Sequence, residues 1–451
     1  MLITNGKLIT WERPNRILEG YAVYISDGRI VEIGAQAEML MRFPHAEQLD
    51  AGGQYVMPGN ICAHTHFYGA FARGLAIPGS PPKDFPDILR KLWWPLDQAL
   101  QMEDVRASAE VMLVDAIRHG TTTLIDHHAS PNAIDGSLDV IAQAVEDTGL
   151  RAVLCYEVTD RYGEEGAKAG IAENIRFIQR VRRENVAGGR LAATFGLHAS
   201  LTLSEETLEN CCSSTPGGVG FHIHVAEHEA DEYDSLAKSG LRAVDRLHKH
   251  GILSENSIAA HAVHIDAREA HLLAQSGTWV THQPRSNMNN GVGVAGVESL
   301  MRAGVPMCLG TDGFSHTMWE EWKTAYLVHK VWNRDPRRMN GANVVEMGVY
   351  NNAALAGKFF TDAPLGLISP GASADLIFVD YHPHTPLTAG NLPWHIIFGF
   401  NESMVTTTIV AGKVLMQDHR LLTLDEEAIT SRARQLAPGV WSRYEEFVPG
   451  D

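Results

Sequence analysis

Cysteine is scarce in this chain of 451 residues: there are five, an odd number at irregular spacing. That pattern excludes a disulfide framework, and without a Cys-x-x-Cys pair a thiolate zinc site is not expected. No apolar run reaches the roughly 18 residues of a membrane span, and the first residues, MLITNGKLITWERP, do not resemble a signal peptide. We therefore expect a reduced, cytoplasmic protein.

Positive charge is also in short supply. Lys and Arg number 37 against 54 Asp and Glu, which gives a net charge of −17 at pH 7. Such a surface repels phosphate backbones and anionic lipids, so we expect neither nucleic acid nor a membrane as a partner. With 45% hydrophobic and 20% charged residues, the composition is otherwise that of an ordinary globular protein.

The two ends of the chain share a pattern of short apolar runs broken by tight turns. In residues 1–57 the turns are Asn-Gly, Asp-Gly and Gly-Gly, and in residues 361–451 glycine again separates runs such as MVTTTIVAGKVLM. The region between them has a different character. The ends therefore predict one small composite domain, a β-sandwich built from both termini, with a helix at the C-terminal end.

Residues 58–360 alternate between short apolar runs and amphipathic stretches. This alternation implies parallel strands joined by right-handed helical crossovers. Eight such units in roughly 300 residues predict an α/β fold of the (β/α)8 TIM-like barrel type. An open doubly wound sheet is the alternative, but no glycine-rich phosphate loop follows the first run. The eight runs are 59–63, 121–126, 151–156, 191–197, 218–225, 256–260, 278–281 and 305–310.

Nearly every run ends on a titratable or metal-binding side chain. In a barrel the carboxyl ends of the strands meet on one face, where active sites are built. We therefore expect these groups to converge, whereas a purely structural pattern would scatter them over helices and loops. They are His64, His66, Asp126, His127, Glu157, His198, His224, His261, His282 and Asp312.

Two His-x-His pairs stand out among these groups. Side chains two positions apart in a strand point to the same side, so His64 and His66 can reach one metal ion. In FHIHVAEHE both His222 and His224 qualify as ligands. Glu227 favours His224, because a carboxylate three residues on can touch the metal-bound water. His222 lies inside the apolar run, so we interpret it as a hydrogen-bonded core histidine.

The later runs supply further candidates. His261 ends its run directly, while His264 falls in the following loop. Asp312 ends a buried run, where a carboxylate must be paired or bound to a cation; a helix N-cap is the alternative interpretation. Three histidines and one aspartate suit zinc or Fe(II) with one position open for water. Glu227 and Asp312, in different environments, can divide the acid and base roles.

Six stretches, taken together and in this order, resemble the amidohydrolase superfamily. The resemblance covers essentially the whole chain, including the β domain built from both termini. It narrows to the cytosine deaminase and chlorohydrolase branch of metal-dependent deaminases, and there to aminohydrolases of the SsnA type. The stretches are PGNICAHTHFYGAFARG, FHIHVAEHEAD, AAHAVHI, QPRSNMNNGVG, LGTDG and NNAALAGKFFTDAPLGLISPGASADLIFVD.

The resemblance implies a role for each matching residue. Glu227 protonates a ring nitrogen of the substrate and then the leaving amine. His261 polarises the attacking hydroxide or the substrate, and Asp312 accepts the proton of the water. His198 contacts the substrate. The implied metal ligands are His64, His66, His224 and Asp312.

Lysine is absent from the fourth run, LAATFGLHA, where binuclear relatives carry a carbamylated lysine. The resemblance therefore implies one divalent metal ion per chain, zinc or Fe(II). It implies a deaminase that replaces an amino group on a nitrogen heterocycle (purine, pyrimidine, pterin or triazine-like) by water and releases ammonia. Hydrolysis of a carbon–chlorine or cyclic amide bond is the alternative, and the intact residue set argues against a silent scaffold. Relatives with this barrel also imply a dimer or larger homo-oligomer.

Several residues beside these motifs have no assigned role. His127 and His128 are adjacent, so at most one of them lines the pocket. Trp93 and Trp94 either pack on the barrel rim or form a lid that stacks on an aromatic substrate. The others are Gln283 and Arg285, together with Phe67, Tyr68 and Arg73 in the loop after His66.

Overall fold

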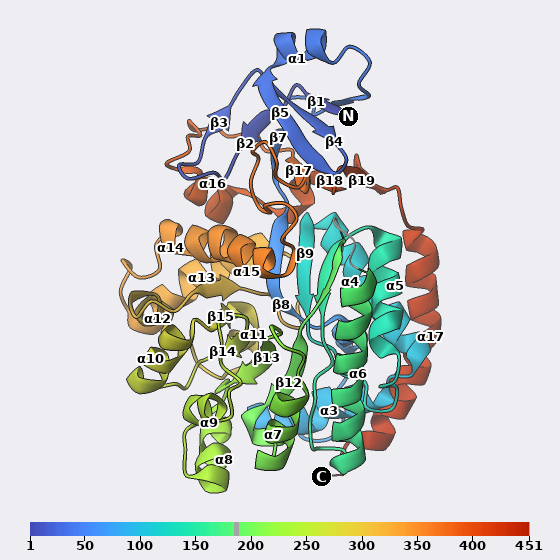
Figure 1. Ribbon diagram of the computed structural model, residues 1–451, viewed down its shortest axis with the longest axis vertical. Coiled ribbons are helices and arrows are strands. Elements are labelled where there is room, and N and C mark those ends of the chain that lie inside the picture. The colour runs from blue at the N-terminus through green and yellow to red at the C-terminus, as the bar shows by residue number, and fades with distance from the viewer. Residues whose placement is uncertain (185–188, 451) are drawn as a thin grey trace.

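The computed structural model describes residues 1–184 and 189–450. The middle of the chain forms a barrel of parallel strands enclosed by helices, and a β module made from both ends of the chain adjoins one end of the barrel (Figure 1). The predicted (β/α)8 barrel with a composite β-sandwich is confirmed, and the open doubly wound sheet is excluded.

Each of the eight predicted runs contributes to the barrel wall. The strands are β8 (Asn60–Thr65), β9 (Thr121–Asp126), β10 (Arg151–Leu154), β11 (Leu191–Ala193), β12 (Phe195–Ala199), β13 (Phe221–Val225), β14 (Ile258–His261), β15 (Trp279–His282) and β16 (Met307–Leu309). The fourth run breaks at Thr194, so β11 pairs with β10 and β12 pairs with β13. Parallel bridges from Val158 to Leu197 and from Thr65 to Asp312 join the two arcs into a ring.

Amphipathic helices cover the outside of the barrel. In α4 (Met102–Arg118) the apolar residues Val105, Leu113 and Ile117 face inward, and the chain then turns at Gly120 with a φ of +71°. The other helices of this layer are α5 (Ser137–Thr148), α6 (Gly163–Glu184), α7 (Glu205–Ser214), α8 (Glu229–Ser239), α9 (Ala243–Lys249), α10 (Ala267–Ser276), α11 (Pro284–Asn290), α12 (Val297–Arg302), α13 (Met318–Asn333), α14 (Gly341–Val345) and α15 (Asn352–Phe359).

Two sheets form the β module: one comes from the N-terminal segment, and the other combines strands from both ends of the chain. One sheet has the order β5 (Arg29–Ala35), β4 (Tyr21–Ser26), β1 (Leu2–Thr4) and β6 (Gln48–Asp50). The other has the order β20 (Arg420–Leu421), β19 (Lys413–Gln417), β18 (Val405–Val410), β17 (Leu376–Val379), β7 (Tyr55–Pro58), β2 (Lys7–Ile9) and β3 (Ile17–Leu18). Ile3, Val23, Val56, Phe378 and Ile409 share one buried cluster, so the module has its own core.

The last helix, α17 (Glu426–Phe447), leaves the β module and runs down the side of the barrel (Figure 1). Its Trp441 donates to the carbonyl oxygen of Phe71, and its Tyr444 donates to that of Lys91. Both acceptors belong to the segment between β8 and α4. The expected domain limits, 1–57 with 361–451 and 58–360, remain a prediction.

The β module lies at the amino ends of the barrel strands, because β7 leads directly into β8. The carboxyl ends of the strands therefore open at the far end of the molecule (Figure 1). Three short helices cover that opening: α2 (Phe85–Ile88), a π-helical turn (Leu89–Trp93) and α3 (Trp94–Ala99). No helix among the described residues has the length and apolar character to cross a membrane.

Candidate active site

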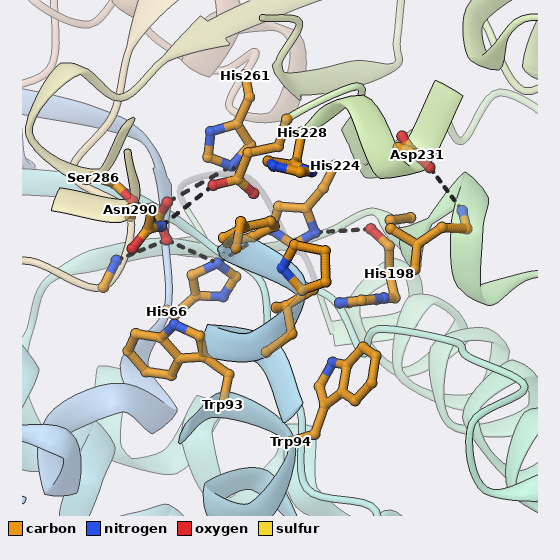
Figure 2. A pocket seen from close by; sticks show the side chains of 18 of the residues that line it. His66, Trp93, Trp94, His198, His224, His228, Asp231, His261, Ser286 and Asn290 are labelled. Atoms are coloured by element: carbon orange, nitrogen blue, oxygen red, sulfur yellow. Dashed lines mark hydrogen bonds and ion pairs between the residues drawn. The ribbon is translucent and has the colours of Figure 1, made fainter. Parts of the chain in front are cut away.

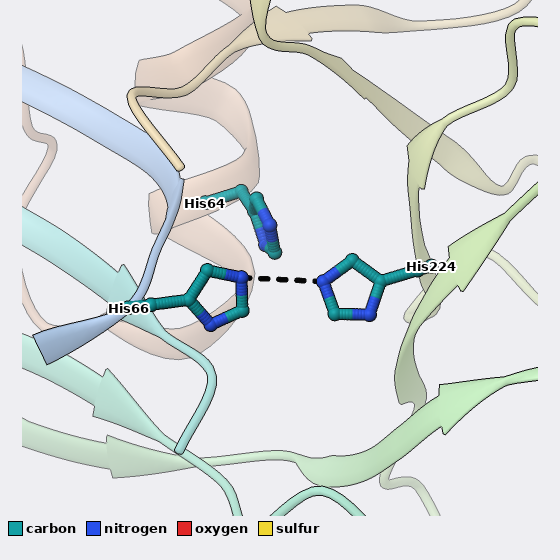
Figure 3. Close-up of side chains that lie close together, drawn as sticks. All are labelled: His64, His66 and His224. Carbon is teal, nitrogen blue, oxygen red and sulfur yellow. Dashed lines mark hydrogen bonds between the residues drawn. The ribbon is translucent and has the colours of Figure 1, made fainter. Parts of the chain in front are cut away.

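Three histidines converge at the carboxyl ends of two barrel strands. His64 and His66 come from β8 and the residue after it, and His224 comes from β13; their candidate ligand atoms lie within 4.8 Å of one another (Figure 3). Nε2 of His66 is 3.2 Å from Nε2 of His224. Nε2 of His64 is buried without a hydrogen-bond partner in residues 1–184 and 189–450. Imidazole nitrogens gathered this way are a donor set for a divalent cation.

Hydrogen bonds at the opposite ring nitrogen turn two of these imidazoles toward the centre. Nδ1 of His66 donates to the carbonyl oxygen of His127 at 2.6 Å, and Nδ1 of His224 donates to that of His198 at 2.8 Å. A neutral imidazole that donates from Nδ1 keeps its lone pair on Nε2. The two Nε2 atoms that face each other are therefore the ones able to bind a metal.

His222 stands behind the third ring. Its side chain is fully buried, and its Nε2 lies 2.8 Å from Nδ1 of His64. A partner at that position fixes the ring plane of His64 and leaves Nε2 of His64 facing the centre. The interpretation of His222 as a hydrogen-bonded core histidine is confirmed.

Asp312 completes the set from the loop after β16. Its Oδ1 lies 3.2 Å from Nε2 of His66. Burial raises the pKa of Asp312, but the combined effect of His66, His261 and Ser286 outweighs burial and holds the pKa below its ordinary value. The alternative interpretation of Asp312 as a helix N-cap is wrong, because α13 begins at Met318 and Thr317 occupies its N-cap.

Glu227 and His261 lie close to Asp312. Nε2 of His261 is 3.3 Å from Oε2 of Glu227 and 3.7 Å from Oδ2 of Asp312. Burial and then the negative charge of Asp312 raise the pKa of Glu227 well above its ordinary value. The pKa values of the two neighbouring carboxyl groups are thus shifted in opposite directions, the arrangement that separates an acid from a base.

A cavity of about 300 Å³ opens onto these groups. It is within the size range of small-molecule sites. Phe85, Leu89, Trp93 and Trp94 supply apolar lining. Figure 2 shows Trp93 and Trp94 on one side of the pocket and His224 and His261 on the other. Trp93 and Trp94 therefore line the cavity, and stacking on a substrate stays a prediction.

His198 points into the same cavity with an acceptor atom. Its Nδ1 donates to Oγ1 of Thr202 at 2.6 Å, and that hydroxyl donates onward to the carbonyl oxygen of Ala199. Because His198 donates from Nδ1, its Nε2 carries the lone pair that faces the cavity. This atom lies 3.9 Å from Oε1 of Glu157.

The sequence did not predict the buried ion network beside His198. Arg161 donates to Glu157 at 2.9 Å and to Asp97 at 3.1 Å, and Tyr162 donates to Asp97 at 2.8 Å. Burial raises the pKa of Asp97 to about 7, against the effect of Arg161. Burial also raises the pKa of Glu157, but His198, His127 and Arg161 together bring it down to about 2. In the sequence, only the four-residue spacing of Glu157 and Arg161 indicates that an ion pair could form here.

Other strand-end groups lie away from the cavity. His127 donates from Nε2 to carbonyl oxygens of Leu197 and His222, and His128 bonds to Ser130. Neither ring lines the cavity, which is consistent with the prediction that at most one of the two does. The remaining residues have structural partners: Asp126 accepts from Phe67, His282 faces His329, His264 donates to Val292, Gln283 donates to Thr281, and Arg285 pairs with Glu320 and Glu321.

Known proteins with similar sequences share the length of this chain. The amidohydrolase family profile matches residues 55–415. A 5'-deoxyadenosine deaminase of Methanosarcina mazei is 32% identical over 98% of this chain and 99% of its own. A 5-methylthioadenosine/S-adenosylhomocysteine deaminase of Haloarcula marismortui is 33% identical over the same shares.

A solved structure is also similar to this chain in its fold. An adenosine deaminase of Xanthomonas campestris with bound zinc has a TM-score of 0.85 and 25% identity, covering 98% of each chain. The buried histidines and aspartate of the present chain suit a divalent metal. The protein is a metal-dependent hydrolase that deaminates a cyclic amidine, and the chain belongs to the amidohydrolase family.

Proposed function

We propose that this protein is a mononuclear zinc deaminase that acts on the adenine ring of a nucleoside. The observation that carries the proposal is the pair of buried carboxyl groups, Glu227 and Asp312, which lie 3.3 Å and 3.7 Å from Nε2 of His261 beside the histidine cluster. The curated relatives named above act on 5'-deoxyadenosine, 5-methylthioadenosine or S-adenosylhomocysteine, which all carry that ring. The SsnA-type likeness, a cytoplasmic location and a homo-oligomeric state are further parts of this proposal.

His64, His66, His224 and Asp312 would hold the metal, with Fe(II) as the alternative to zinc. When bound, the metal supplies a Lewis acid that makes a coordinated water acidic near neutral pH.

A second ion is disfavoured at the neighbouring cluster of His127, Glu157 and His224, whose ligand atoms also lie within 4.8 Å. Nδ1 of His224 is occupied by a carbonyl oxygen, and Glu157 is paired with Arg161. Nδ1 of His127 lies 3.3 Å from Oε2 of Glu157. The donors of this cluster therefore have partners within the protein, and one metal per chain fits them better than two.

The proton positions define the chemistry of the protein's own groups. Asp312 takes one proton of the attacking water, and Glu227 gives its proton to the ring nitrogen next to the carbon that carries the amino group. The carbon becomes tetrahedral, and Glu227 then relays the hydroxyl proton to the leaving amine. As ammonia departs, the proton on Asp312 returns to Glu227, so the carboxyl groups end in their starting states.

Replacement of Glu227 by Gln tests the assignment. Ammonia release from 5'-deoxyadenosine, 5-methylthioadenosine and S-adenosylhomocysteine is measured with the zinc-loaded enzyme, together with zinc content. We expect kcat to fall about 10²- to 10⁴-fold with about one zinc retained per chain. Glu229→Gln makes the same change on an exposed residue at the start of α8 and serves as the control.

Two results would contradict the proposal. One is a Glu227→Gln variant that releases ammonia at the parent rate. The other is a parent enzyme that releases chloride from a chlorinated heterocycle or opens a cyclic amide, and that releases no ammonia from aminated heterocycles.

A further inference from the structure

A buried amide determines where His261 carries its proton. Asn287, in α11, is 1% exposed, and its Nδ2 lies 2.9 Å from Nδ1 of His261. An amide nitrogen donates hydrogen bonds and does not accept them, so Nδ1 of His261 is the acceptor. An imidazole that accepts at Nδ1 is neutral and has its hydrogen on Nε2.

This proton position is the reverse of that in the neighbouring rings. His66 and His224 donate from Nδ1 to backbone carbonyl oxygens, which leaves a lone pair on Nε2. His261 instead presents an N–H group to the same buried centre. The cluster therefore contains two kinds of histidine, and the group bonded to Nδ1 decides which kind each ring is.

The surroundings of Nε2 support this orientation of the amide. Oε2 of Glu227 and Oδ2 of Asp312 lie 3.3 Å and 3.7 Å from Nε2 of His261. An N–H group facing two carboxyl oxygens is attractive. If the amide of Asn287 were turned over, a lone pair of His261 would face the carboxylate of Asp312, and electrostatic repulsion disfavours that arrangement.

We propose that Asn287 is a positioning residue that holds His261 as the Nε2–H tautomer, so that His261 donates a hydrogen bond in the reaction and does not bind the metal. The kinetic consequence rests on the proposed deaminase function, whereas the tautomer does not. A donor at this place stabilises the negative charge that develops on the oxygen attacking the amidine carbon. A lone pair at the same place would compete for the metal and give no such stabilisation.

Nitrogen-15 NMR of the labelled, zinc-loaded parent protein reads the tautomer directly. The ring signals of His261 are assigned by their loss in His261→Gln. We expect the shift and proton coupling of Nε2 to be those of an N–H nitrogen and those of Nδ1 to be those of an unprotonated nitrogen. A proton on Nδ1 would overturn the proposal, and this measurement needs neither a substrate nor an Asn287 variant.

Asn287→Asp replaces the donor by an acceptor of the same size. We expect His261 to switch to the Nδ1–H tautomer and kcat to fall by about a hundredfold or more, while the overall fold, followed by circular dichroism, stays that of the parent. Asn333→Asp makes the same exchange on the exposed face of α13 and serves as the charge control.

Asn287→Leu separates the reversal of a hydrogen bond from its loss. We expect a smaller fall in kcat than in Asn287→Asp, with His261 no longer held in one tautomer. An unchanged tautomer in both variants, or equal kcat losses without a tautomer change, would assign Asn287 a purely structural role and overturn the proposal. A parent enzyme without deaminase activity would contradict the proposed function instead and leave the tautomer result standing.

Discussion

Gly310 lies where the first and last barrel strands meet, and a side chain there should disturb the metal site. A Cβ at Gly310 would lie 2.6 Å from the carbonyl oxygen of His64 and 2.7 Å from its backbone nitrogen. Both neighbours are backbone atoms, so neither can move aside as a flexible side chain would. The same carbonyl oxygen accepts from the backbone nitrogens of Thr311 and Asp312 at 3.0 Å. Gly310→Ala should therefore separate His64 from Asp312.

The size of the effect follows from these distances. Ordinary van der Waals contact begins at 3.4 Å, so the strands must part by several tenths of an ångström. Ligand distances at a metal site tolerate only about 0.2 Å. We expect zinc affinity to fall at least tenfold, which corresponds to about 1.4 kcal/mol. Overpacking should also lower the free energy of unfolding of the metal-free protein by about 1–3 kcal/mol.

Competition with a chromophoric chelator measures zinc affinity, and urea denaturation of the metal-free protein measures stability. Gly357→Ala is the matched control, because a Cβ there meets nothing within 4 Å and the residue lies inside α15. That variant should bind zinc as the parent does and be slightly more stable. Parent-like zinc affinity and stability in Gly310→Ala would refute the argument from strand contact.

Three further changes probe the pocket and its supports. Trp94→Ala should raise KM about tenfold with a smaller effect on kcat, in steady-state assays, because Trp94 lines the cavity and stacks on Arg161 at 4.9 Å. Asp115→Ala should lower the free energy of unfolding by about 1–3 kcal/mol, as measured by urea denaturation, because it leaves the buried backbone nitrogen of His316 without its hydrogen-bond acceptor. Burial raises the pKa of Glu205, but Arg246 and His250 bring it below its ordinary value. Glu205→Gln should therefore be less stable than the parent at pH 7, and that deficit should shrink as the pH falls below about 4 in denaturation series, because the parent carboxylate loses its contribution once protonated.

The strand ends are the part of the site that the sequence predicts well. In a parallel barrel a buried strand is a local apolar run, and the residue that follows it necessarily faces the same opening as the ends of the other strands. His64, His66, His224, His261 and Asp312 all meet this condition, and the structure brings them together. Their proximity follows from chain order and strand direction alone, without knowledge of any loop.

The cavity walls could not be predicted in the same way. Asp97 lies in a short helix before α4, and its partner Arg161 follows β10, 64 positions later in the chain. No periodic pattern connects them, because their contact depends on the path of a long connection over the barrel. Bonds from Trp441 and Tyr444 of α17 to that connection come from still further along the chain. Loops fixed by such distant partners carry no local sequence signal.

Four residues at the same strand ends have a strained backbone. Ala226, His261, Ala262 and Asp312 all have φ between 46° and 74°, a left-handed conformation that residues with a side chain seldom adopt. Each such residue costs of the order of 1–3 kcal/mol unless its surroundings enforce it.

The enforcing contacts are visible in the structure. The backbone nitrogen of Ala226 donates to Asp231 at 2.7 Å, that of Ala262 donates to Val225 at 2.9 Å, and that of Asp312 donates to His64 at 3.0 Å. These backbone bonds hold the strained strand ends in place, and the cost of the strain falls on the stability of the barrel.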